Sequence, residues 1–494
     1  MITPAHTVRP LSLAALAVTG GLVLSGCGAG TLTGSGDGGQ RALETNGQEV
    51  VADADGTGVE VSRRLFDSAD AVVVSSPERD DQLLAAAIAA KLGAPMLVRL
   101  PGTDAAVDAE VDRLGAERVV TVPGDDEAVV STEPVVSADP AADIQAVLAL
   151  EPANPLDLKL PPMFATEATS VAAAATARAA GAPVSLLPAA DPRATSESMA
   201  TVQEQDTIAL GVQWGTAEDY THRAALASNG ELPGGGGLVF PGRRMIALYG
   251  HPSGPALGIM GEQGPAEAAE LARQYAAQYQ PLEEQPVIPA FEIIVTVASD
   301  SPGDDGDYSN ETDPADVVPY LDAITQAGGY AVLDLQPGQG DFLNQAKLYE
   351  ELLLRPNVGL ALDAEWKLNP GEQPLSRVGS ATAEEINAVA DWLAQLTRDN
   401  NLPQKAFVLH QFKVAMFPDR ENIRTEHPEL AYVLHADGHG TPGQKFDTWN
   451  VLRQDLDPGF YMAWKNFIDE DTPMFTPEQT YADVDPRPWF VSYQ

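Results

Sequence analysis

Short apolar runs alternate with helix-length amphipathic segments along most of the chain after residue 60. Between residues 71 and 211 they form two similar units, and each unit predicts the order strand, helix, strand, helix, strand. The first unit extends from the apolar run 71–75 to 118–122, and the second extends from 163–165 to 207–211. Continuous apolar strands separated by helices are typical of a parallel sheet that is covered on both faces. The pattern therefore predicts a flavodoxin-like parallel α/β domain.

The same tripeptide, Gly-Ala-Pro, follows the first helix of each unit, at 93–95 and at 181–183. Glycine commonly ends a helix, and proline restarts the chain in an extended conformation. Over residues 65–215 the pattern resembles the type 2 cell-wall-binding repeat of Gram-positive surface proteins, which implies attachment to a wall polymer. The alternative is a structural α/β domain without a ligand. Because no phosphate-cradling glycine loop follows these strands, we expect no nucleotide.

The second half of the chain repeats a theme of apolar strand, polar strand end, loop and helix. After a glycine-rich linker at 231–244, eight apolar runs predict the strands of a C-terminal (β/α)8 (TIM) barrel. The predicted strands are 245–249, 292–298, 330–335, 358–362, 406–409, 431–434, 459–463 and 489–491. The predicted helices between them include 264–278, 316–327, 342–354, 383–398 and 446–453.

The N-terminus combines Arg9 with an apolar run at 11–24 and the sequence Leu24-Ser-Gly-Cys27. This pattern indicates an export signal that is too short to span a membrane. Its end resembles the lipobox of bacterial lipoproteins, which implies cleavage before Cys27 and acylation of that thiol. The alternative is an ordinary signal peptide with a chance cysteine. We expect a lipid anchor on the extracytoplasmic face of the cell membrane.

Four regions follow from these patterns. They are a signal peptide at 1–26, a flexible tether at 27–58, the α/β domain at 59–235 and the barrel at 236–494. The tether is predicted because the segment is rich in Gly, Ser, Thr and Asp with little apolar periodicity.

The charge of the chain restricts its partners. Lys and Arg number 29 against 71 Asp and Glu, a formal net charge of −42. Such a surface repels phosphate, so the sequence predicts no nucleic-acid partner, and it disfavours anionic polymers. A neutral polysaccharide is compatible with this charge. Cys27 is the only cysteine, so the sequence allows no intrachain disulfide. The sequence predicts no cofactor.

Two carboxylates, Asp363 and Glu365, follow the apolar run 358–362. Side chains two residues apart on a strand point the same way, so both would face the barrel mouth. Two close carboxyl groups do not both ionise freely, so the pKa of one is raised, as the general acid of glycoside hydrolysis requires. Asp334, after the neighbouring strand, is a candidate third carboxylate.

An apolar strand that ends in Asp-x-Glu resembles the fourth strand of barrel glycosidases, both chitinase-like and lysozyme-like muramidase barrels. The chitinase pattern has two more aspartates upstream, where this chain has Gly359 and Ala361. The muramidase resemblance implies that Glu365 is the acid and that Asp363 or Asp334 stabilises the developing charge. The alternative is that Asp363 and Glu365 only cap the next helix or line an inactive cleft.

Other polar and aromatic residues cluster at the predicted strand ends and are candidates for substrate binding. They are Tyr249, His251, Asp300, Gln336, Trp366, His410, Gln411, His435, Asp437 and Trp464.

The segment His435-Ala-Asp437-Gly-His439, with His410 and His251, carries a second hypothesis, a metal-dependent deacetylase or amidase. Gly438 and Gly440 favour a loop there, where strand alternation fails, so our main interpretation contains no metal. It is a lipid-anchored envelope protein whose barrel acts on or binds an envelope polysaccharide. The remaining alternative is a non-catalytic wall-binding lipoprotein.

Overall fold

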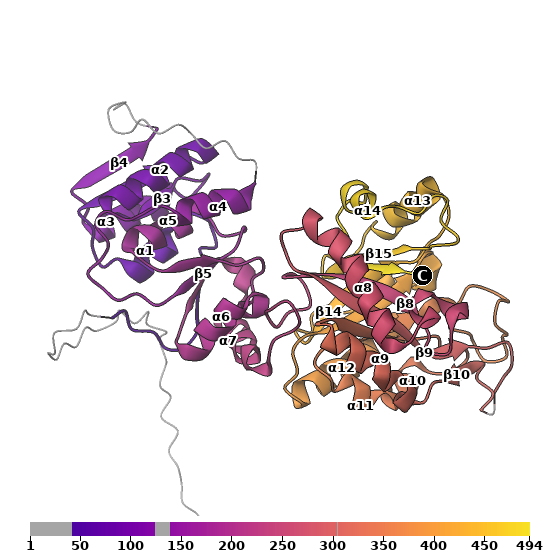
Figure 1. Cartoon of the computed structure of the whole chain (residues 1–494). Coiled ribbons are helices and arrows are strands. Elements are labelled where there is room, and N and C mark those ends of the chain that lie inside the picture. The colour runs from indigo at the N-terminus through magenta and orange to yellow at the C-terminus, as the bar shows by residue number, and fades with distance from the viewer. Residues whose placement is uncertain (1–41, 124–138, 304) are drawn as a thin grey trace, which may run out of the picture.

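The computed structural model describes residues 42–123, 139–303 and 305–494 (Figure 1). The signal segment, Cys27 and the first part of the predicted tether lie outside the described residues. The described chain forms two lobes, an N-terminal α/β region and a C-terminal barrel (Figure 1). Among the described helices, none is both long and apolar enough to cross a membrane.

The N-terminal region contains two parallel sheets, one from each predicted unit. The first has the order β3-β2-β4, and the second has the order β6-β5-β7 with β1 added beside β7. In both, the first strand of the unit lies at the centre, so the two units share one topology. Their strands are β1 (Glu49–Val51), β2 (Ala71–Ser75), β3 (Met96–Val98), β4 (Arg118–Val122), β5 (Met163–Ala165), β6 (Val184–Leu186) and β7 (Ile208–Leu210).

The predicted tether is wrong at its C-terminal end. Strand β1 lies inside it and pairs in parallel with β7, with Val51 buried. The prediction missed this strand because only three residues, Glu-Val-Val, carry it, too few to show alternation. The folded region therefore begins before residue 59.

Alanine-rich helices join the two units. Helix α2 (Arg79–Leu92) and helix α5 (Val171–Ala180) share one apolar cluster, in which Ala86 and Ala175 are fully buried. Both helices end at the predicted glycines, Gly93 and Gly181, in the left-handed conformation. The other helices of this region are α1 (Val59–Leu65), α3 (Asp104–Leu114), α4 (Pro140–Leu148), α6 (Ser196–Glu204) and α7 (Ala217–Leu226).

All eight predicted barrel strands are present and all pair in parallel. The first strand, β8, pairs with both the last strand and the second, which closes the barrel. The strands are β8 (Arg244–Gly250), β9 (Val287–Ala298), β11 (Tyr330–Leu335), β12 (Val358–Asp363), β13 (Lys405–Gln411), β14 (Leu430–Ala436), β15 (Phe460–Asn466) and β16 (Phe490–Tyr493). A short strand, β10 (Ser309–Glu311), adds antiparallel to β9.

Helices surround the barrel, as its α/β pattern requires. The long helix predicted at 342–354 is two shorter ones, α10 and α11, separated at Tyr349, whose hydroxyl donates to the Val295 carbonyl. The helices are α8 (Pro265–Tyr279), α9 (Pro314–Gln326), α10 (Phe342–Leu348), α11 (Glu350–Leu353), α12 (Ala383–Asp399), α13 (Pro442–Leu452) and α14 (Pro477–Asp483).

The interior of the barrel is apolar towards the N-terminal ends of its strands. Met245, Val332, Val408 and Val433 belong to one buried cluster there. The segment 231–243, predicted as a linker, covers this end, because Phe240 joins the same cluster and packs 5.3 Å from the ring of Tyr461. Towards the C-terminal strand ends the interior changes character.

Candidate functional site

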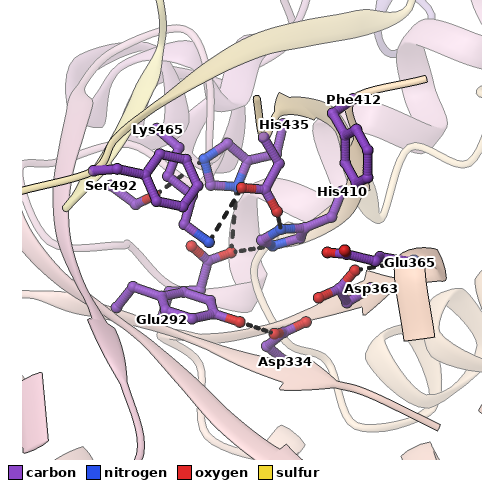
Figure 2. Close-up of polar contacts among 12 residues, drawn as sticks. Glu292, Asp334, Asp363, Glu365, His410, Phe412, His435, Lys465 and Ser492 are labelled. Carbon is purple, nitrogen blue, oxygen red and sulfur yellow. Dashed lines mark hydrogen bonds and ion pairs between the residues drawn. The ribbon is translucent and has the colours of Figure 1, made fainter. Parts of the chain in front are cut away.

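Each barrel strand sends one buried polar side chain into the barrel, near the C-terminal end of the strand in every case except the long strand β9. We call these eight side chains the polar layer (Figure 2). None of the eight is more than 3% exposed. In β8-to-β16 order they are Tyr249, Glu292, Asp334, Asp363, His410, His435, Lys465 and Ser492. Asp437, just after β14, and Glu365, just after β12, extend the polar layer towards the barrel mouth.

His410 lies at the centre of the polar layer and contacts two carboxylates. Its Nε2 lies 2.8 Å from Oε1 of Glu292 (Figure 2). Its Nδ1 lies 2.8 Å from Oδ2 of Asp437. Because both acceptors are carboxylates, both ring nitrogens donate and the ring is an imidazolium. Burial opposes this charge, but Glu292 and then Asp334 raise the pKa of His410 well above its ordinary value.

His435, the neighbour of His410 in the strand register, has a different environment. Its Nε2 lies 3.1 Å from the hydroxyl of Ser492. Its Nδ1 lies 3.5 Å from Oε1 of Glu292 and makes no hydrogen bond within the described residues. Burial lowers the pKa of His435, whereas the Glu292 carboxylate beside it raises it. Of the two adjacent histidines, only His410 lies within hydrogen-bond distance of two carboxylates.

Lys465 supplies the second positive charge. Its ammonium lies 3.2 Å from Oδ1 of Asp437 and 3.7 Å from the centre of the Tyr249 ring. Burial disfavours this charge, but Asp437 and then Glu292 raise the pKa of Lys465. Burial also disfavours the Glu292 carboxylate, but His435 and His410 hold the pKa of Glu292 well below its usual range.

The three predicted catalytic carboxyls lie on the β11–β12 side of the polar layer (Figure 2). Oδ2 of Asp334 accepts a hydrogen bond of 2.8 Å from the Tyr249 hydroxyl, and burial raises the pKa of Asp334 to about 6. Oδ1 of Asp363 accepts a hydrogen bond from the backbone N–H of Glu365, 3.1 Å away. Burial and then Asp334 raise the pKa of Asp363 well above its ordinary value.

Glu365 differs from the other carboxyls because it is only half-buried. Its side chain makes no hydrogen bond or ion pair within the residues that the structure describes. Burial and the nearby Asp437 raise the pKa of Glu365. A partly exposed carboxyl with a raised pKa and free oxygens is available to deliver a proton to a bound substrate.

The polar layer and its margin contain most of the residues that the sequence singled out. Asp334, Asp363, His410 and His435 belong to it, and Glu365 and Asp437 extend it. Tyr249 also belongs to it, and Gln336 donates to the Tyr249 hydroxyl across 3.3 Å. Trp366, next to Glu365, is half-buried.

Four predicted binding residues lie elsewhere. Gln411 faces out of the barrel and accepts from Arg420, and Trp464 packs among Phe446, Trp449 and Phe475 under the helices. His251 bonds to Ser253 and Thr312, and Asp300 is exposed on a loop. His439, part of the metal hypothesis, is exposed as well.

The sequence analysis missed Glu292, Lys465 and Ser492 as site residues. Glu292 escaped notice because the predicted strand began there, whereas β9 begins five residues earlier and buries Glu292 in its middle. A single acidic residue inside the apolar run 287–298 was the available signal. Lys465 follows the outward-facing Trp464. Its side chain turns inward because β15 continues to Asn466, three residues beyond the predicted strand end.

Three sets of side chains among the described residues bring metal-capable atoms within 4.8 Å of one another. Two are buried in the polar layer, Glu292 with His410 and His435, and Asp363 with His410 and Asp437. The third, Asp305 with Asp307 and Glu311, lies on the loop after β9 and at the end of β10.

The fold and the site together define a (β/α)8-barrel protein with an ionisable cluster at the carboxyl ends of its strands. Comparisons with protein-family models, with curated proteins and with solved structures found no significant match. The resemblances to wall-binding repeats, bacterial lipoproteins and barrel glycosidases therefore depend on the motifs of this chain alone.

Proposed function

We propose that the barrel is a glycoside hydrolase that cuts a neutral polysaccharide of the cell envelope. The observation that carries the proposal is the burial of six ionisable side chains in one layer, at the end of the barrel where such folds place their active sites. These side chains are Glu292, Asp334, Asp363, His410, His435 and Lys465.

Burial of this kind favours an enzyme over an inactive scaffold. Removing a charge from water costs several kcal/mol, and well-packed apolar side chains of similar volume are often more stabilising than buried ion pairs. Two acceptors, Oε2 of Glu292 and Oδ1 of Asp334, are buried without a hydrogen-bond partner within the described residues. Selection for stability alone would not retain these buried unpaired groups, whereas selection for catalysis would.

The arrangement of the carboxyls supports glycosidic cleavage. Glu365, at the mouth, is the proposed general acid, which protonates the oxygen of the leaving sugar. Asp334, held by the Tyr249 hydroxyl, is the proposed carboxylate that stabilises the positive charge developing on the sugar ring. Asp363 holds the backbone of Glu365 in place, so the capping alternative and the catalytic role are compatible.

The substrate class follows from charge and aromatic residues. A net charge of −42 favours a neutral polymer over an anionic one. Half-buried Trp366 follows Glu365 directly, and half-buried Phe412 follows His410 by two residues. Such rings offer flat faces for sugar stacking. The lipobox resemblance supports an envelope location, and the α/β region is the proposed wall-holding part.

The test uses residues 28–494, which keep β1 and omit the lipidated cysteine. Wild type and Glu365→Gln are incubated with purified cell-wall sacculi and with neutral envelope glucans, and new reducing ends are counted. Glu351→Gln, an exposed change on α11, is the matched control. We expect release by wild type and the control, and none by Glu365→Gln.

Two outcomes contradict this proposal. Equal release by Glu365→Gln and wild type removes Glu365 as the acid. No release by any protein, with all three co-sedimenting with the sacculi, favours the non-catalytic wall-binding lipoprotein.

A further inference from the structure

We propose that Glu292, His410 and His435 form a binding site for one divalent transition metal of the zinc class. The inference goes beyond the proposed glycosidase function, which needs no metal. Its three ligands come from β9, β13 and β14, and all three side chains are fully buried.

The geometry of the three side chains fits a metal between them. Oε1 of Glu292 lies 2.8 Å from Nε2 of His410 and 3.5 Å from Nδ1 of His435. Zinc binds such atoms at about 2.0–2.2 Å in tetrahedral geometry, which separates the ligand atoms from one another by about 3.4 Å. One pair already has this separation, and the other needs to open by roughly half an ångström.

Each histidine also has the outer partner that metal-binding histidines require. Metal-ligating rings use one nitrogen for the metal and donate the other N–H to a carboxylate, carbonyl or hydroxyl, which fixes the ring and its tautomer. Nδ1 of His410 has Asp437 at 2.8 Å, and Nε2 of His435 has Ser492 at 3.1 Å. In both rings the nitrogen nearer Glu292 is the one that would face a metal, and in His410 this nitrogen now bonds to Glu292 itself.

Two of the three side chains also carry an unpartnered polar atom. Nδ1 of His435 and Oε2 of Glu292 are buried without a hydrogen-bond partner in the described part of the chain. In the proposed site, the metal replaces the proton on Nε2 of His410, which leaves to solvent, and accepts the lone pair of His435. The carboxylates of Glu292, Asp334 and Asp437 provide the negative charge that balances the metal and Lys465.

The donor set selects the class of metal. Imidazole nitrogens suit zinc, iron, cobalt, nickel and copper, whereas calcium and magnesium prefer sites made of oxygen alone. Two histidines and one glutamate leave a coordination position open for water or substrate, as in catalytic zinc sites. The set of Asp305, Asp307 and Glu311 has only oxygen ligands, and it is the alternative place where an added metal ion could bind.

The test is titration of the chelator-treated protein, residues 28–494, with Co2+, followed by its visible d–d absorption, with Zn2+ as competitor. We expect one Co2+ per chain with an intense four- or five-coordinate spectrum that Zn2+ abolishes. Glu292→Gln removes the anionic ligand at constant size and should weaken Co2+ binding by at least about tenfold. Ser492→Ala removes the hydroxyl that holds the His435 ring and should weaken Co2+ binding by a similar factor. Circular dichroism verifies that each variant is folded.

Two control variants separate this inference from its alternatives. Asp307→Asn, in the loop set, and Glu365→Gln, the proposed acid, should bind Co2+ as wild type does. No stoichiometric Co2+ on folded wild type overturns the inference, as does equal binding by wild type and Glu292→Gln. Because the readout is metal binding, it is independent of whether the barrel cuts a polysaccharide.

Discussion

The two ends of the barrel interior are equally buried, but one is lined by apolar side chains and the other by ionisable ones. Towards the N-terminal strand ends, Met245, Val332 and Val408 fill the barrel with apolar groups, whose burial stabilises the fold. Towards the C-terminal ends, residues at equivalent inward positions carry charge, among them Glu292, His410 and Lys465. The difference shows that one end of the barrel serves stability, while the other retains groups whose burial opposes it.

The largest expected effect is on catalysis at the charged end. Glu365→Gln keeps the size of the side chain and removes its proton, so we expect the rate of reducing-end release to fall by about 10²–10⁴-fold, the usual contribution of general acid catalysis. The free energy of unfolding should change little, because the Glu365 side chain has no partner within the described residues. Parallel assays of release and chemical denaturation check both expectations. A large loss of stability in this variant would contradict the contrast between the two ends.

The apolar end should respond in the opposite way. Met245→Ala removes a fully buried side chain from β8 and leaves a cavity. We expect a loss of about 2–5 kcal/mol in the free energy of unfolding, the range for large-to-alanine changes in cores. The KM of the remaining folded enzyme should be unchanged. Urea titration measures the first quantity, and a loss below about 1 kcal/mol would show that this end is loosely packed.

Lys405 is a charge-bearing group at the apolar end, at the start of β13. Its ammonium donates to the carbonyls of Arg355 and Val358, and burial lowers its pKa from 10.5 to about 7. Below pH 7 the amine is charged in both states, and the fold carries the whole desolvation cost. Above pH 7 the unfolded chain binds more protons than the folded one, so this contribution to stability rises with pH.

We therefore expect wild type to gain about 2 kcal/mol relative to Lys405→Met between pH 7 and pH 8.5. Urea titrations of both proteins at several pH values provide the difference. A constant difference across this range would mean that Lys405 keeps its ordinary pKa in the folded protein.

The smallest expected effect on stability concerns Asp334, at the charged end. Asp334→Asn keeps an acceptor for the Tyr249 hydroxyl and removes a buried ionisable group. We expect a gain of about 1 kcal/mol in the free energy of unfolding together with a large loss of activity, the usual exchange at active sites. Urea titration and the reducing-end assay measure the two effects. Loss of both stability and activity would show that Asp334 supports the fold.

The sequence predicted the fold more fully than the site. Apolar runs located all eight barrel strands and both α/β units, because a strand that is buried on both faces consists of consecutive apolar residues. Orientation at strand ends was harder to predict. Strand β13 continues through Gln411, so alternation turns Gln411 outward beside the inward His410. Strand β15 continues to Asn466, which turns Trp464 outward beside Lys465.

The polar layer also depends on distances that no local pattern contains. Glu292 and His410 are 118 residues apart in the chain and 2.8 Å apart in the fold. The pair Asp363 and Glu365 was found because its two members are neighbours in the sequence. Closure of the barrel brings Glu292, Lys465 and Ser492 into one layer from strands that are far apart in the sequence.

The pairing of β8 with β16 joins residues about 245 and 490, nearly opposite ends of the barrel sequence. A chain that is still being synthesised has β8 and β15 as open sheet edges until β16 arrives. Open edges pair readily with other chains, so this interval is the period of greatest exposure to aggregation and proteolysis. Addition of the last strand thus both closes the sheet and supplies Ser492 to His435.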